Sequence, residues 1–264
     1  MTAAEEMDFE RRFGGIARLY GAPALAKLQA AHVCVIGIGG VGSWAAEALA
    51  RSAVGRITLI DLDHVAESNT NRQIHALDGE FGKAKVQAMA QRIHGINPAC
   101  VVSGIEEFVT EENVAAILPP CDAVLDAIDN VRAKAALIAY CRSAGIGIVT
   151  TGAAGGRCDP TRIQVADLAR TVQDALASKL RARLRKEHGF SRDPKEKFGV
   201  ECVFSVEPVV SPENTAPACD VDEGPGDHDG LQGLNCAGYG SAVTVTATFG
   251  LTAAARVLQR LISD

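Results

Sequence analysis

A glycine-rich loop between an apolar segment and an alanine-rich segment constrains the fold of this chain more than any other feature. The loop, residues 37–42, has the sequence GIGGVG and follows the continuous apolar run of residues 33–37. Residues 41–52 are rich in alanine, which favours a helix. A buried parallel strand that turns tightly into a helix is typical of nucleotide-binding units. The sequence therefore predicts a strand, a glycine turn and a helix at this position.

Predicted strands and predicted helices alternate along the residues that follow. Apolar runs predict the strands, and amphipathic segments between them predict the helices: strands at 56–61, 100–103, 123–129 and 147–151, and helices at 82–96, 111–118 and 132–144. Such alternation indicates parallel strands joined by right-handed helical crossovers. We expect an α/β fold: a Rossmann-like, doubly wound, mainly parallel sheet with helices on both faces and an appended C-terminal strand and helix region.

The pattern changes after residue 151. We expect strands at 162–167 and 199–206, a charged amphipathic helix at 168–188 and a final helix at 241–262, whereas residues 207–240 are rich in Gly, Pro and Asp. With 264 residues, the chain suits one domain with appendages. We therefore predict a single domain over 1–264, comprising a helical arm at 1–30, a substrate-facing insertion and flexible loop at 160–240, and a C-terminal helix at 241–264.

Composition limits the functional class and the compartment. The net charge is −6, so any binding of nucleic acid must depend on a local basic patch. The eight cysteines contain no C-x-x-C pair, which argues against a zinc site of that spacing. Several of them lie inside apolar runs, where we expect reduced thiols that act as small core residues. The first residues are acidic and lack an apolar stretch, and the apolar segment 241–255 is short for a membrane span. We expect a cytoplasmic protein without a stable membrane partner.

Polar side chains follow the second predicted strand. We expect them at the carboxyl ends of the parallel strands, where the glycine loop also lies. A carboxylate at Asp61 suits hydrogen bonds from ribose hydroxyls. Arginine can bind a phosphate through two N–H groups, and lysine supplies a point charge. The candidate ATP-binding residues are Gly37, Gly39, Gly40, Gly42, Asp61, Asp63, Asn69, Asn71, Arg72, Gln73, Lys85, Asp129 and Asn130.

Two aspartates belong to the predicted strand at 123–129. Asp129 is expected at its carboxyl end, where open α/β sheets bind ligands, and a carboxylate there suits Mg²⁺ held between protein and triphosphate. Asp126 should point to the other face of the sheet and have a structural role. A nicotinamide-using domain is disfavoured, because hydride transfer has no use for the polar set formed by Asn71, Arg72, Lys85 and Asp129.

Five motifs occur in order over residues 30–150: GIGGVG, LIDLD, NTNRQ, FGKAK and DAIDN. Through them the chain resembles the E1-like, ThiF/MoeB-type adenylating superfamily. Through RRFGGIARLYG, GGVGSWAAEALAR, NTNRQIHAL, KAALIAYCR and FGVECVFS it is similar to the tRNA threonylcarbamoyladenosine dehydratases within that superfamily. The resemblance implies that the glycine loop and Asp61 hold adenosine, that Asn71, Arg72 and Lys85 contact phosphates, and that Asp129 binds Mg²⁺ beside Asn130.

The resemblance also implies the reaction. ATP would adenylate the threonine carboxylate of N6-threonylcarbamoyladenosine at position 37 of tRNA, and ring closure would then complete a dehydration. The alternative is an E1-like adenylyltransferase that activates the C-terminus of a small sulfur-carrier protein. Sulfur-transfer members of the superfamily usually carry two C-x-x-C pairs for structural zinc, and their absence from this sequence weighs against the alternative.

Further expectations come from the same resemblance. Arg72, Lys85 and Asp129 would be catalytic, together with Cys236, which is either a reactive cysteine tied to a cysteine desulfurase and sulfur-acceptor system or a small packing residue. The family is homodimeric, and in the wider superfamily an N-terminal arginine reaches the partner's ATP site. Arg12 and Arg18 are both candidates for that arginine. A structural Na⁺ or K⁺ near the dimer interface is also allowed.

A basic segment is the candidate contact for tRNA. Residues 179–197 contain eight Lys or Arg against three acidic residues, and such a stripe suits phosphate contacts. A solvated helix face is the alternative explanation for a run of charge. The candidate tRNA-binding residues are Lys179, Arg181, Arg183, Arg185 and Lys186.

Overall fold

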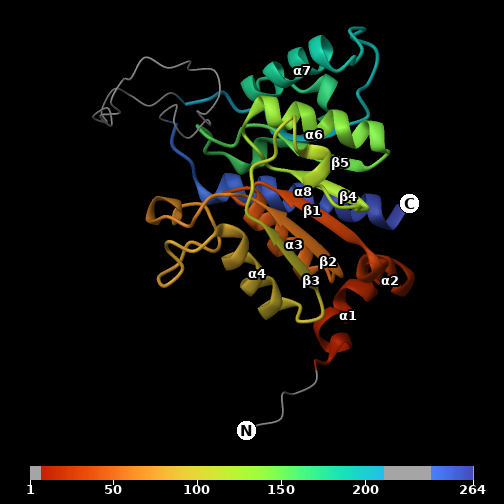
Figure 1. Cartoon of the computed structure of the whole chain (residues 1–264), viewed down its shortest axis with the longest axis vertical. Coiled ribbons are helices and arrows are strands. Elements are labelled where there is room, and N and C mark those ends of the chain that lie inside the picture. Colours follow the sequence, from red (N-terminus) through yellow and green to blue (C-terminus); the bar gives the residue numbers. More distant parts are fainter. Residues whose placement is uncertain (1–6, 211–238, 264) are drawn as a thin grey trace.

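A seven-stranded sheet organises the computed structural model, which describes residues 7–210 and 239–263 (Figure 1). The strand order is β3-β2-β1-β4-β5-β7-β6. All neighbouring strands pair in parallel except β6 and β7, which pair antiparallel. The predicted doubly wound, mainly parallel sheet is confirmed. Its strands are β1 (His32–Ile36), β2 (Arg56–Ile60), β3 (Val101–Ile105), β4 (Ala123–Asp126), β5 (Gly147–Thr151), β6 (Ile163–Asp167) and β7 (Glu201–Ser205).

Helices cover both faces of the sheet, and each face has its own apolar core. One core is formed against α3 (Gly42–Arg51), α4 (Lys85–Ile96) and α8 (Val243–Ser263). The other is formed against α5 (Val114–Ile117), α6 (Val131–Ala144) and α7 (Ala175–Glu187). Aliphatic residues dominate both cores, as expected for a buried parallel sheet. The N-terminal arm consists of α1 (Phe9–Tyr20) and α2 (Ala22–Ala30).

The C-terminal helix packs closely against the first helix of the nucleotide-binding unit. A Cβ at Gly250 of α8 would lie 2.3 Å from the carbonyl oxygen of Val41, directly before α3. Glycine is needed there because any side chain would separate the two helices. Strands β6 and β7 extend the same sheet, so the late segments of the chain are built onto the core.

Several element boundaries differ from the sequence predictions; the helix predicted at 82–96, for example, begins only at Lys85. The expected helix at 168–188 is divided: a 3-10 turn, Leu168–Arg170, comes first, and α7 starts only after Asp174. The division occurs because Gln173 has a φ of 53° and the Asp174 carboxylate accepts a hydrogen bond from the backbone N–H of Ala177. The predicted helix at 111–118 is helical only over Val114–Ile117. The predicted strand at 123–129 ends at Asp126.

No helix within residues 7–210 and 239–263 is both long and apolar enough to span a membrane.

Candidate active site

The glycine loop has a conformation that requires two of its glycines. Gly37 has a φ of 84°, and a Cβ at this position would lie 2.9 Å from the carbonyl oxygen of Ala127. A Cβ at Gly42 would lie 1.8 Å from the carbonyl oxygen of Gly37. By contrast, a Cβ at Gly39 would meet no atom within 4 Å. Gly37 and Gly42 therefore shape the turn, and Gly39 borders open space at the start of α3, where a phosphate can approach.

Asp61 joins the end of the second strand to the glycine loop. Its Oδ2 accepts a hydrogen bond from the Ile38 backbone N–H at 2.5 Å, and its Oδ1 accepts one from the Asp63 N–H at 2.8 Å. Burial raises the pKa of Asp61, and the charge of Lys85 opposes that increase. Each carboxylate oxygen has a second lone pair, so the side chain can still accept hydrogen bonds from a ribose.

Lys85 and Asp63 form an ion pair beside this carboxylate. The Lys85 Nζ lies 2.6 Å from Asp63 Oδ2, and the lysine side chain is 7 % exposed whereas that of Asp63 is 54 % exposed. The ammonium is held by the fold at the first residue of α4, while its partner faces solvent. A second anion arriving at this edge would therefore meet an ordered positive charge.

Arg72 approaches the glycine loop from the segment that follows β2. A Cβ at Gly40 would lie 3.2 Å from the Arg72 Cγ, so the arginine side chain lies close against the glycine loop. Its guanidinium donates hydrogen bonds to the Ser68 carbonyl oxygen at 2.8 Å and to Asn71 Oδ1 at 3.0 Å. Partial burial lowers the pKa of Arg72. The structure thus brings together the glycine loop and the arginine predicted from the sequence.

Neighbouring amides hold this segment in place. Asn71 donates from Nδ2 to the carbonyl oxygen of Ser241 at 2.8 Å, which ties the segment to the residues before α8. Asn69 is buried, and its Oδ1 accepts from the Ala66 backbone N–H. Gln73 is buried as well, and its Oε1 has no hydrogen-bond partner in the described part of the chain. Asn69 therefore supports the turn from inside, whereas Gln73 keeps a free acceptor.

Asp129 and Asn130 lie on a turn that packs against the glycine loop. The turn starts at Ala127, whose N–H donates to the Ile36 carbonyl oxygen at 2.8 Å. Asp129 is exposed, three residues after β4 ends. Asn130 caps α6, because its Oδ1 accepts from the N–H groups of Arg132 and Ala133 at 3.0 Å each. The turn beside the loop expected to hold phosphates therefore carries an exposed carboxylate.

Asp126 has the structural position that the sequence predicted for it. It is fully buried and pairs with Lys134 at 2.8 Å. Lys134 was missed by the sequence analysis. A lysine within the apolar run KAALIAY was the available signal.

His75 is a second residue that sequence reasoning missed. The side chain is 2 % exposed, and neither ring nitrogen has a hydrogen-bond partner among the residues the structure describes. Burial, together with the charges of Lys85 and Arg92, lowers the pKa of His75 to about 4. The imidazole is therefore neutral at neutral pH and lies within the electrostatic influence of Lys85.

Acidification is expected to destabilise the protein through His75. The unfolded chain binds this proton below the ordinary pKa of 6.5 and the folded chain only near 4, so the free energy of unfolding falls as pH drops across that window. The expected loss from this group approaches about 3 kcal/mol at the acid end. Urea unfolding at a series of pH values should show a shallower loss for His75→Leu than for wild type. Equal pH dependence would contradict the assignment.

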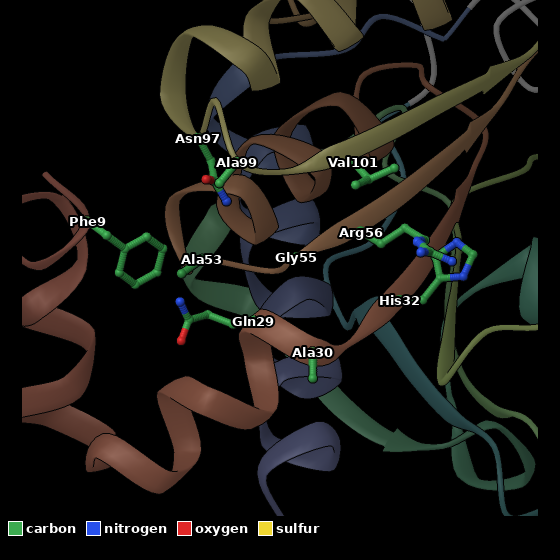
Figure 2. Close-up of a pocket in the computed structure, with 10 residues that line it drawn as sticks. All are labelled: Phe9, Gln29, Ala30, His32, Ala53, Gly55, Arg56, Asn97, Ala99 and Val101. Atoms are coloured by element: carbon green, nitrogen blue, oxygen red, sulfur yellow. The ribbon is translucent and has the colours of Figure 1, made fainter. Parts of the chain in front are cut away.

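The predicted N-terminal arginines are on α1, which lies at the amino-terminal ends of the parallel strands, opposite the ends that carry the glycine loop. Phe9 of α1 lines a cavity with His32, Arg56 and Val101, the first residues of β1, β2 and β3 (Figure 2). The glycine loop follows the other end of β1. Arg12 donates to the Ile96 carbonyl oxygen at 2.9 Å, at the end of α4. Neither Arg12 nor Arg18 on α1 is therefore placed to serve this chain's own loop.

The predicted tRNA-binding residues are only partly free. Three of the arginines on α7 have partners within the protein: Arg181 donates to Thr171 Oγ1, Arg183 pairs with Glu187, and Arg185 donates to the Ser191 carbonyl oxygen. Lys179 and Lys186 are exposed. Cys236 lies outside the described residues.

Comparison with known proteins is consistent with this geometry. The model of the ThiF family matches residues 13–264. The tRNA threonylcarbamoyladenosine dehydratase of Escherichia coli is 52% identical over 97% of this chain and 95% of its own length, and that of Haemophilus influenzae is 48% identical over the same shares. The crystal structure of the E. coli dehydratase TcdA in complex with ATP has a TM-score of 0.86 and 50% identity, covering 99% of this chain and 98% of that one. The chain therefore belongs to the ThiF family and, within it, to the tRNA threonylcarbamoyladenosine dehydratases.

Proposed function

We propose that this chain catalyses the ATP-dependent dehydration of N6-threonylcarbamoyladenosine at position 37 of tRNA. One observation carries the proposal: the glycine loop, Arg72 and the turn of Asp129 converge at the carboxyl ends of the parallel strands. The relationship to dehydratases over nearly the whole chain supports it. A solved relative of the same length contains ATP.

The chemistry follows from charge and proximity. The threonine carboxylate attacks the α-phosphorus of ATP, pyrophosphate leaves, and an acyl-adenylate forms. Arg72, which lies against the glycine loop, and Lys85, whose ammonium is held at the start of α4, would neutralise the charge that develops on the phosphates. The carbamoyl group of the same nucleoside then attacks the activated carbon, and AMP leaves with the carboxylate oxygen. Ring closure within one molecule is favoured once the carbon is activated. The net change is the loss of one water.

The donor set at this edge fits Mg²⁺. Magnesium is usually held by one or two carboxylates and completed by substrate phosphates. Asp129 supplies an exposed carboxylate, and the described residues contain no cluster of three or more metal-ligating side chains. We propose that Asp129, beside Asn130, holds Mg²⁺ when the nucleotide is bound. The ion would neutralise negative charge on the phosphates.

The carrier-protein adenylyltransferase is not favoured. Its sulfur-transfer members use two C-x-x-C pairs, which this sequence lacks. The sequence identity between this chain and the E. coli dehydratase extends over 97% of the chain, including the segments after the nucleotide-binding unit.

We also propose a homodimer. Arg12 and Arg18 lie at the edge remote from this chain's own loop, so a role at a nucleotide requires a second copy. On the same helix, the apolar side chain of Leu19 is 71% exposed, as is expected where a second subunit covers the surface. Because the proposed substrate is tRNA, we place the protein in the cytoplasm. The monovalent cation and the sulfur-acceptor system with Cys236 stay predictions from the resemblance.

Mass spectrometry of the modified nucleoside tests the proposed function. tRNA carrying threonylcarbamoyladenosine is incubated with protein and Mg-ATP and then digested mildly, because the cyclic product can reopen in base. An ATP-dependent loss of one water from the nucleoside is the expected result. An unchanged nucleoside, from protein that still binds ATP, would favour the carrier-protein adenylyltransferase.

The basic face of α7 gives a prediction for tRNA binding. Lys179 and Lys186 are exposed, so the double variant Lys179→Glu/Lys186→Glu should weaken tRNA binding by about tenfold and reduce the salt slope by about two. Filter binding at several salt concentrations measures both quantities. Lys27→Glu reverses an exposed charge on α2 and serves as the control. An equal effect in both variants would show that net charge, and not this face, is responsible.

A further inference from the structure

A closed cluster of ionic and polar groups lies directly beneath the turn that carries Asp129. The ammonium of Lys134 on α6 donates to Asp126 Oδ2 at 2.8 Å and to Thr150 Oγ1 at 3.0 Å. The Thr150 hydroxyl donates to the same Asp126 oxygen at 2.7 Å. All three residues are completely buried. The cluster thus joins three elements, β4, β5 and α6.

Stability by itself does not explain such a cluster. A buried ion pair gives up the hydration of both charges, and apolar residues of similar volume often stabilise a fold equally well or better. A well-satisfied pair instead specifies one conformation, because every alternative leaves a charge without a partner in a dry interior. The question is therefore which conformation this pair specifies.

The contacts of Asp126 answer that question. Its second oxygen, Oδ1, accepts a hydrogen bond from the Ile128 N–H at 3.1 Å, within the turn that leads to Asp129. On the other side, the backbone N–H of Lys134 donates to the Asn130 carbonyl oxygen at 3.0 Å. The Asp126 carboxylate therefore holds the start of the turn directly, and the ion pair fixes α6, which begins at the other end of the turn, against β4. Between those ends, Ala127 packs on Gly37 of the glycine loop.

We propose that Asp126 and Lys134 are positioning residues that hold the turn at 127–130, and so place Asp129 for Mg-nucleotide binding. The inference rests on the proposed function of Asp129. Neither residue touches the nucleotide in this arrangement, because both are sealed beneath the turn. Their effect is to fix the position of the carboxylate relative to the glycine loop before the nucleotide arrives.

A double variant tests the inference without leaving a buried charge. Asp126→Asn/Lys134→Met removes both charges and keeps similar volumes, and Lys134→Arg keeps the charge. ATP affinity is measured by calorimetry on the full chain, with EDTA and across Mg²⁺ concentrations, and amide hydrogen exchange is followed at residues 127–130. We expect at least about tenfold more Mg²⁺ for half-maximal enhancement of ATP binding in the double variant. In the double variant, amide exchange at residues 127–130 should be faster, and ATP affinity in EDTA should be nearly unchanged. Lys134→Arg keeps the charge and should retain part of the Mg²⁺ response that the double variant loses.

Two further variants separate the explanations. Glu47→Gln removes another buried carboxylate, which pairs with Arg51 and Arg92 on the far side of α3, and controls for general loss of stability. Asp129→Asn tests the proposed metal ligand itself. A wild-type Mg²⁺ response and wild-type exchange in the double variant would overturn the positioning role. The same changes in Glu47→Gln would also overturn it. A wild-type Mg²⁺ response in Asp129→Asn would instead overturn the proposed metal site.

Discussion

Gly42→Ala is expected to destabilise the folded protein by about 4 kcal/mol or more, which is in the range of the most damaging single substitutions. The added Cβ would lie 1.8 Å from the carbonyl oxygen of Gly37 and 3.3 Å from the Cβ of Ala127. Both neighbours belong to segments that cannot shift freely: Gly37 donates to the Ile60 carbonyl oxygen, and Ala127 donates to that of Ile36. The first turn of α3 would have to move away from the sheet. Thermal and urea unfolding followed by circular dichroism measure the effect.

A neighbouring glycine supplies the matched control. A Cβ at Gly39 would meet no atom within 4 Å, and Gly39 is not among the glycines with a positive φ. The free energy of unfolding of Gly39→Ala should therefore lie within about 0.5 kcal/mol of wild type, because the added methyl group meets no other atom. If Gly42→Ala and Gly39→Ala were equally stable, the tight turn between β1 and α3 would not have the conformation described.

Arg72→Ala is expected to lower kcat/KM for ATP-dependent loss of water from the modified tRNA by about 100-fold to 1,000-fold. The reason is electrostatic, because removal of a fixed donor leaves the charge that develops on the phosphates without its partner. Arg72 lies against Gly40 and is held by Ser68 and Asn71, so little of its position depends on the ligand. The nucleoside assay by mass spectrometry gives the rate, and calorimetry gives the ATP affinity.

Two other variants sharpen this prediction. Arg72→Lys keeps the charge but loses the planar pair of N–H donors, so we expect only partial recovery of activity. Arg56→Ala removes an exposed arginine at the first residue of β2, at the strand end remote from the glycine loop, and should have nearly wild-type activity. Wild-type activity in Arg72→Ala would refute the phosphate role, whereas equal losses in Arg72→Ala and Arg56→Ala would point to a general loss of positive charge.

Local sequence was sufficient to predict the nucleotide-binding half of the fold. The steric demands of Gly37 and Gly42, the apolar strand before them and the carboxylate of Asp61 all act within one strand–turn–helix–strand unit. Glycine sterics and strand periodicity depend on nearby residues, so they are present in the sequence itself. Boundaries were harder to predict, because the Asp174 cap starts α7 at Ala175, whereas amphipathicity alone extended the helix back to residue 168.

Contacts between distant segments were decided only by the tertiary structure. Asn71 bonds to the carbonyl oxygen of Ser241, and Gly250 permits α8 to lie against the start of α3. Lysine side chains usually lie on the surface, yet the packing of α6 on β4 and β5 buries the ammonium of Lys134 with Asp126 and Thr150. Such pairings depend on which elements become neighbours when the whole sheet assembles. The sequence by itself determined the loop and the chemistry of its side chains, and the assembled sheet decided which buried groups hold them in place.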